Sequence, residues 1–235
     1  MLVGFLTFFD NVSIKKQNSR AKSEYEVSVA KWQRDCDILK KITDVFTGAS
    51  KGNDAEGVSY SAVLGAGEIA LWSGQCIYHE ASRGPGRYVG GSQGFSIPIT
   101  KGIRYRVSST QGTYQQGAES QQEKDAGSLL VTTTRIIFSG SLHGHEWLFS
   151  KLTGSGKTPD GCSFTFNVSN RQKASGVTVD ASVAEEFGYF LQTALRYAND
   201  GMSATLHELA DLAKEAEAAK PVEPTYLELK QKGSG

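Results

Sequence analysis

Two hydrophobic periods divide this chain. Between residues 19 and 46, apolar side chains recur at steps of three and four, and charged side chains fill the positions between them. This pattern predicts one amphipathic helix of about seven to eight turns. Such a stripe packs either on the chain's own domain or on an external partner. The predicted stripe consists of Tyr25, Val29, Trp32, Cys36, Leu39, Ile42 and Phe46.

The period changes to two from residue 74 onward. Most of the alternating runs are bounded by Gly, Pro, Ser or Asn, as is typical of short strands joined by turns. Many short strands at this spacing predict a β-sandwich or β-barrel. The strands are expected at residues 75–81, 94–99, 103–108, 127–132, 135–139, 146–151, 162–169 and 176–180.

A helical pattern returns at residues 181–197, where one face is apolar. An Asn-Asp-Gly sequence at 199–201 predicts the end of this helix, and a second helix is expected at 203–220. The fold class is therefore α+β, a barrel or sandwich whose open end is closed by a C-terminal helix, with a long N-terminal helix and an extra C-terminal one. The closing side chains would be Phe187, Phe190 and Leu191.

These boundaries give five parts. Residues 1–18 are an apolar N-terminal segment, 19–47 the amphipathic helix, 48–65 a Gly-containing linker, 66–199 the mostly-β domain, and 200–235 a C-terminal helix with a mobile tail. The first nine residues are largely apolar, but about 20 are needed to span a bilayer. The three cysteines have no disulfide or zinc spacing, which favours reduced thiols and a cytoplasmic location.

The charge balance bears on the partners. Lys plus Arg and Asp plus Glu both number 25, so no nucleic-acid partner is expected. Residues 81–118 nevertheless contain basic side chains and no acidic one. An anion site and an ordinary solvated basic face are both compatible with this composition. The basic residues there are Arg83, Arg87, Lys101, Arg104 and Arg106.

Catalytic and metal chemistry find little support. The string GSGKT at 154–158 lacks the first glycine of a phosphate-binding loop and precedes Pro159, which predicts a hairpin loop instead. His143 and His145 would share one face of an extended chain, but no third ligand lies nearby on that face, which favours a polar hairpin tip. No nucleophile motif is present. We therefore expect no enzyme activity, no metal and no cofactor.

The segment 127–151, GSLLVTTTRIIFSGSLHGHEWLFSK, resembles the strand-turn-strand-loop-strand pattern of GRAM and bacterial PH-like domains. The wider chain, including 92–107 and 166–173, is similar over residues 20–198 to bacterial proteins of unknown activity in which a long helix precedes a PH-like domain. The resemblance implies a fold, and fold alone does not specify function. The matching positions are Gly127, Thr133, Arg135, Ile136, Phe138, Trp147 and Phe149.

Three functional hypotheses follow. In the first, the chain is a membrane-surface adaptor, because loops of PH-like domains commonly hold phosphoinositides; the resemblance then implies that Arg83, Arg87, Arg104 and Arg106 hold an anionic head group. In the second, the chain is a scaffold that forms a homodimer or docks a protein partner through its N-terminal helix. The third, a small-molecule sensor or enzyme at the barrel mouth, has the least support. The partner-binding residues of the scaffold would be Trp32, Tyr25 and Leu39.

Overall fold

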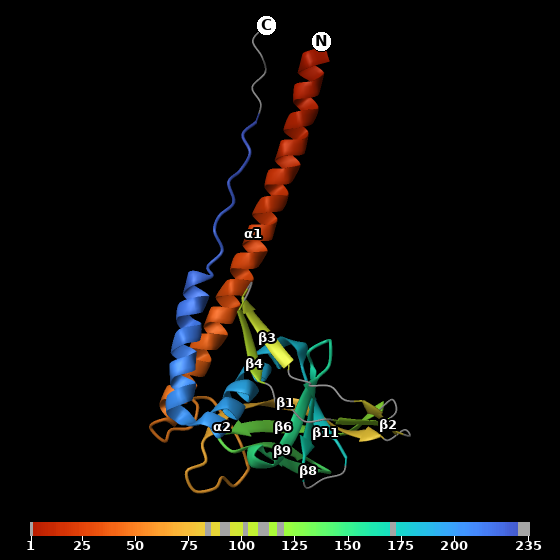
Figure 1. Ribbon diagram of the computed structural model, residues 1–235, viewed down its shortest axis with the longest axis vertical. Helices are drawn as coiled ribbons and strands as arrows, with labels where there is room; N and C mark the ends of the chain where they lie inside the picture. Colours follow the sequence, from red (N-terminus) through yellow and green to blue (C-terminus); the bar gives the residue numbers. More distant parts are fainter. Residues whose placement is uncertain are drawn as a thin grey trace.

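The computed structural model describes the backbone of residues 2–82, 86–89, 95–100, 103–107, 113–116, 120–169 and 173–229. Side chains are described for residues 11–80, 122–169 and 173–229. Within these parts the chain forms a curled antiparallel sheet, a long helix that projects from it, and a kinked helix that covers it (Figure 1).

Helix α1 runs from Leu2 to Ala49 without a break. The predicted helix is confirmed, and it extends through the apolar segment at the start of the chain. Ion pairs at a spacing of four support its exposed part, among them Arg20 with Glu24 at 2.8 Å. At 1.5 Å per residue α1 is about 72 Å long, and its first half projects away from the sheet (Figure 1).

The main sheet has seven antiparallel strands in the order β8-β7-β6-β1-β11-β10-β9. It is curled into a half-barrel. The curl brings β8, at one edge, against strands near the other edge. Trp147 on β8 donates its indole N–H to Ser175 Oγ of β11 at 3.0 Å, and its ring lies 5.1 Å from that of Phe166 on β10. The strands are β1 Ala70–Ser82, β6 Ser120–Thr132, β7 Arg135–Gly140, β8 Gly144–Leu148, β9 Leu152–Lys157, β10 Ser163–Val168 and β11 Ser175–Val179.

Four shorter strands lie between β1 and β6 in the sequence. The outer two of these four pair with each other, and so do the inner two. Strand β2 (Gly86–Val89) pairs with β5 (Thr113–Gln116), and β3 (Phe95–Thr100) pairs with β4 (Ile103–Val107). The sequence predicted β3 and β4 but neither β2 nor β5, which are only four residues long.

Helix α2 spans Ala181–Ala218 and is interrupted at Gly201, whose φ of 82° is not helical. Asp180 caps its start by accepting a hydrogen bond from Ser182 N at 2.8 Å. The predicted pair of helices with a break at 199–201 is thus confirmed. The first half covers the sheet, where Phe187 is fully buried and lies 5.1 Å from Trp72. The second half turns back beside α1 (Figure 1).

Two predictions for individual segments are changed by the structure. The predicted strand 146–151 ends at Leu148, and a 3-10 turn, η1, occupies Phe149–Lys151. The predicted hairpin loop at 154–158 is wrong for its first four residues, which belong to the edge strand β9 and pair with β10. Alternation of Gly and Ser hides this strand from a hydrophobicity pattern. The turn itself comes later and is closed by Gly161 N donating to Thr158 O at 2.9 Å.

Candidate functional site

A cleft of about 750 Å³ lies among the described residues, and we call it the loop cleft. It lies where the end of α1, the irregular segment 50–69 and the kink of α2 meet. A volume of this size falls within the range of small-ligand sites. Its walls are formed by Ala49, Ser50, Gly52, Asn53, Asp54, Tyr60, Leu64, Gly67, Glu68, Ile69 and Tyr197.

Glu68 holds one wall of the loop cleft in place. Its Oε1 accepts hydrogen bonds from Thr132 Oγ1, Thr134 Oγ1 and Arg135 Nε, and its Oε2 accepts from Gly65 N and Arg135 Nη2, all between 2.6 and 2.9 Å. Burial would raise the pKa of this carboxyl, but these donors, with Arg135 the strongest, lower it to about 2. Through Glu68, Gly65 at the end of the predicted linker 48–65 is tied to the sheet.

Asp54 and Tyr60 form another part of the wall. Asp54 Oδ1 accepts a hydrogen bond from Ala70 N at 2.8 Å, and Oδ2 accepts one from the Tyr60 hydroxyl at 2.6 Å. The hydrogen bond to the carboxylate raises the pKa of Tyr60. In the part of the chain that the structure describes, no basic side chain lies within 4.0 Å of Asp54. Two hydrogen bonds hold its carboxylate in position, and none of the described basic side chains pairs with it.

The basic residues proposed from the sequence do not lie on one element. Arg83 is outside the described residues. Arg87 is on β2 opposite Gln115, whereas Arg104 and Arg106 are on β4, opposite Pro98 and Ser96. Arg104 and Arg106 are two positions apart on one strand, as predicted. For these three residues the structure describes the backbone alone, which gives their strand and their position opposite the paired strand.

Two of the three proposed partner-binding residues contact α2 of the same chain. Trp32 donates its indole N–H to Ala216 O at 2.7 Å, and Lys220 Nζ lies 5.4 Å from the centre of its ring. Leu39 is only 8% exposed and belongs to the core. Tyr25 is half-buried on α1, beyond the point where α2 ends. The stripe from Trp32 onward therefore packs within the chain.

The expected tail also lies along α1. The side-chain amide of Asn18 donates to Leu227 O at 2.8 Å and accepts from Leu227 N at 2.9 Å. Residues 221–229, for which the sequence analysis predicted mobility, follow the upper part of the helix (Figure 1). Leu227 and Leu229 remain about half exposed, at 52% and 49%.

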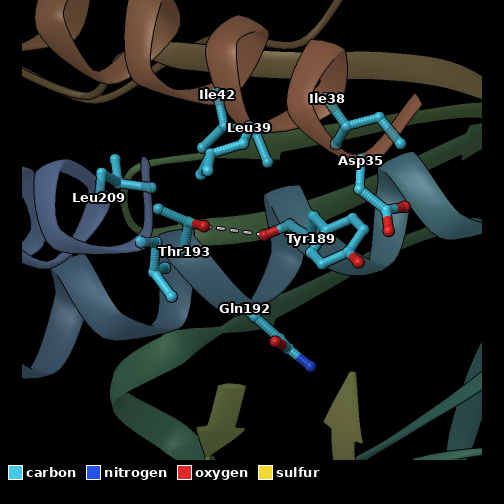
Figure 2. A pocket seen from close by; sticks show the side chains of 9 residues that line it. Asp35, Ile38, Leu39, Ile42, Tyr189, Gln192, Thr193 and Leu209 are labelled. Atoms are coloured by element: carbon cyan, nitrogen blue, oxygen red, sulfur yellow. Dashed lines mark hydrogen bonds between the residues drawn. The ribbon is translucent and has the colours of Figure 1, made fainter. Parts of the chain in front are cut away.

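A second, much smaller cavity lies in the seam between α1 and α2 (Figure 2). Its volume of about 20 Å³ has room for a single water molecule. Figure 2 shows Ile38, Leu39 and Ile42 of α1 above it, whereas the amide of Gln192 points the other way. That amide is fully buried, and neither of its polar atoms has a hydrogen-bond partner among the described residues. The seam cavity is too small for an organic ligand.

The histidine pair lies on one face of β8 and its preceding turn, as the alternation predicted. The His143 and His145 rings are 6.4 Å apart and nearly parallel, and Tyr78 stacks on His145 at 4.2 Å. Tyr78 donates its hydroxyl to Glu80 Oε1 at 2.7 Å. Among the described side chains, no group of three or more His, Cys, Asp or Glu residues has a metal-binding arrangement.

Sequence reasoning missed the loop cleft. Asp54 and Tyr60 lie in an interval that was interpreted as a linker, and Tyr197 was the last residue of the predicted helix 181–197. One signal was available, because an irregular segment of about 20 residues inside a compact domain is uncommon and is often functional. The meeting of this segment with the end of α1 and the kink of α2 is a tertiary property.

Comparison with known proteins finds no match. No protein-family model, no curated protein and no solved structure is similar to the chain at a significant level. Within the described residues, no helix combines the length and the apolar character that crossing a membrane requires.

Proposed function

We propose that the chain is a non-enzymatic PH-like module that a helical stalk attaches to an anionic membrane surface, on the cytoplasmic side. One observation carries the proposal: α1 is a single continuous helix whose apolar start lies at the end farthest from the sheet (Figure 1). Residues 2–9, with the sequence LVGFLTFF, are apolar except Gly4 and Thr7. At about 100° per residue these two positions are neighbours on the helix, and the apolar positions cover the rest of its circumference. A helix with so broad an apolar surface is suited to lipid or a protein core.

The dimensions of α1 fit partial insertion. Eight residues of helix are about 12 Å long, which is close to the thickness of one hydrocarbon leaflet, about 15 Å. Lys15 and Lys16 are exposed and follow Phe9 by about 9 to 11 Å along the axis. They would then lie at the depth of the lipid head groups, where each basic residue near an anionic surface adds about 1 kcal/mol.

The PH-like part of the proposal rests on the sheet and on the resemblance. The matching residues fall on three neighbouring strands, with Gly127 on β6, Arg135 on β7 and Trp147 on β8. Gly127 has a packing reason, since a Cβ at this position would meet Ser139 O at 2.3 Å. Burial of Arg135 against Glu68 gives the basic position of the pattern a structural role, not a lipid-binding one.

Flotation on lipid vesicles tests the proposal. We expect the wild-type chain to float with vesicles containing phosphatidylserine, and we expect the triple variant Phe5→Ser, Phe8→Ser, Phe9→Ser to stay in solution. Val27→Ser is the matched control, because Val27 is 68% exposed on the same helix but lies far from its start. A wild-type chain that fails to float, or a triple variant that floats equally well, would reject membrane attachment through α1.

Self-association through α1 is the second candidate. It is favoured by one observation: in the described structure α2 ends near Trp32, and the part of α1 that precedes this point projects away from the sheet (Figure 1). Trp32 and Leu39 already pack against α2 of the same chain. Of the three proposed partner-binding residues, Tyr25 is the one that lies outside this contact. Light scattering decides: a dimer that Tyr25→Ala converts to a monomer supports this candidate, and a monomeric wild type removes it.

A further inference from the structure

The loop cleft has no part in membrane attachment and calls for its own explanation. It is built by an ordered segment of irregular backbone that the sheet holds through Glu68, Asp54 and a hydrogen bond from Arg135 Nη2 to Val63 O at 2.9 Å. Ordering such a segment costs conformational entropy. Its contacts stabilise one shape of the cleft. That shape combines apolar walls with the carboxylate of Asp54, which has no basic partner among the described side chains.

The apolar part of the wall consists of two phenol rings and two aliphatic side chains. Tyr60 is 38% exposed, and Tyr197 is half-buried with its ring 6.4 Å from that of Phe46. Leu64 and Ile69 are half-buried beside them. Aromatic faces attract cations, and aliphatic walls pack against the methylene stem of a lysine-like or arginine-like group.

The polar part of the wall is negative. Glu68 is ionised but Arg135 neutralises it, at 2.8 Å between Nε and Oε1. Asp54 has no such partner among the described residues. Two helices also direct their C-terminal ends to this region, since α1 ends at Ala49 and the first half of α2 stops before Gly201. The C-terminal end of a helix carries a partial negative charge, so the field in the cleft favours a cation and disfavours an anion.

We propose that the loop cleft binds an alkylammonium or guanidinium group, with Asp54 as its counter-ion and Tyr60 and Tyr197 against its stem. The site is independent of the membrane proposal. A free amine and a lysine or arginine side chain of a protein share this chemistry, and the probes below separate these two sources.

The test is a titration of the full chain in which binding is monitored by changes in the NMR chemical shifts of the backbone amides. The probes are Nα-acetyl-lysine N-methylamide, cadaverine and the neutral analogue Nα-acetyl-norleucine N-methylamide. We expect the capped lysine or cadaverine to bind with a Kd of about 1 to 10 mM, with shifts confined to residues 49–69 and the neighbourhood of Tyr197. Tighter binding of the capped lysine would assign a protein side chain, and tighter binding of cadaverine a free amine.

Asp54→Asn is the decisive variant, because asparagine keeps an acceptor for Ala70 N and removes the charge. We expect it to weaken cation binding about fivefold. Glu56→Gln is its matched control, since Glu56 is an exposed carboxylate of the same segment that does not line the cleft, and it should change the Kd less than twofold.

Tyr197→Leu provides a second variant that leaves Asp54 intact, and it should also weaken binding. The proposal is overturned if the neutral analogue binds wild type as tightly as the lysine probe, if Asp54→Asn binds unchanged, or if the shifts fall outside the cleft. The comparison of charged and neutral probes needs only wild type, so it decides the matter even if a variant does not fold.

Discussion

The indole N–H of Trp32 donates to the backbone carbonyl oxygen of Ala216 at 2.7 Å. This one bond joins α1 to the last turn of α2 across 184 positions of sequence. The same carbonyl lies near a helix end, where no intrahelical donor remains to pair with it. Trp32 therefore caps α2 and also fixes the angle at which the stalk leaves the half-barrel.

Replacing Trp32 separates the stability contributed by its hydrogen bond from the stability contributed by its ring. Trp32→Phe keeps most of the apolar contact and loses the hydrogen bond, so we expect the free energy of unfolding to fall by about 1 kcal/mol. Trp32→Ala also removes the ring, and we expect a loss of about 2 to 4 kcal/mol. Urea unfolding measures both values. Equal stability of the phenylalanine variant and wild type would mean that the bond to Ala216 contributes nothing in solution.

Gln192 offers a stabilising substitution. Its amide is fully buried, and neither polar atom is paired within the described part of the chain. A buried unpaired polar group costs about 1 to 3 kcal/mol. Gln192→Met has a similar shape without that cost, and we expect thermal unfolding to shift upward. Gln33→Met, at an exposed position of α1, is the control and should leave the melting temperature nearly unchanged. A destabilised Gln192→Met variant would indicate that the amide has a partner, such as a buried water.

Glu68 makes stability depend on pH. Its pKa is lowered from 4.5 to about 2 in the folded chain, so the folded state binds its proton more weakly than the unfolded state does. The stabilisation is therefore complete above pH 4.5 and is lost as the pH falls toward 2, by roughly 3 kcal/mol at most. We expect Glu68→Gln to flatten this part of the stability profile measured by denaturant unfolding between pH 2 and 6. A variant with the same slope as wild type would contradict the assignment.

Gly201 tests the kink of α2. Its φ of 82° and ψ of 173° lie in a backbone region that is essentially restricted to glycine. A Cβ there would meet nothing within 4 Å, so the cost of a side chain is purely conformational. We expect Gly201→Ala to destabilise the chain by about 1 to 3 kcal/mol. Gly156→Ala is the control, because its Cβ also meets nothing and its φ is not positive. Identical effects at both positions would argue against the glycine-specific conformation at the kink.

The arginines of β4 test the lipid hypothesis separately from the stalk. We expect Arg104→Glu with Arg106→Glu to reduce flotation on vesicles containing phosphatidylserine, because reversing two charges near an anionic surface opposes attraction. Flotation that depends only on the apolar start of α1, and is unchanged by the double variant, would place these arginines outside the membrane contact. Circular dichroism of the variant confirms that its fold is retained.

Local patterns determined most of the secondary structure. The three-and-four spacing around Trp32 and Leu39 predicted α1, the alternation in 162–169 predicted β10, and the Asn-Asp-Gly sequence predicted the break at Gly201. Each of these signals is contained within a few turns or one strand, so it can be recognised without knowing what lies opposite. Strand β9 was missed because Gly and Ser at an edge leave no hydrophobic alternation.

Tertiary structure alone decided how these elements meet. The sequence left open whether the stripe of α1 would pack on its own chain. The contact of Trp32 with Ala216 shows that the stripe does so from Trp32 onward. The loop cleft likewise depends on bringing Asp54, Tyr60 and Tyr197 together from two separate segments. Spacing along a chain determines which faces are apolar, but the choice of partner for each face depends on the competition among all surfaces that the fold makes available.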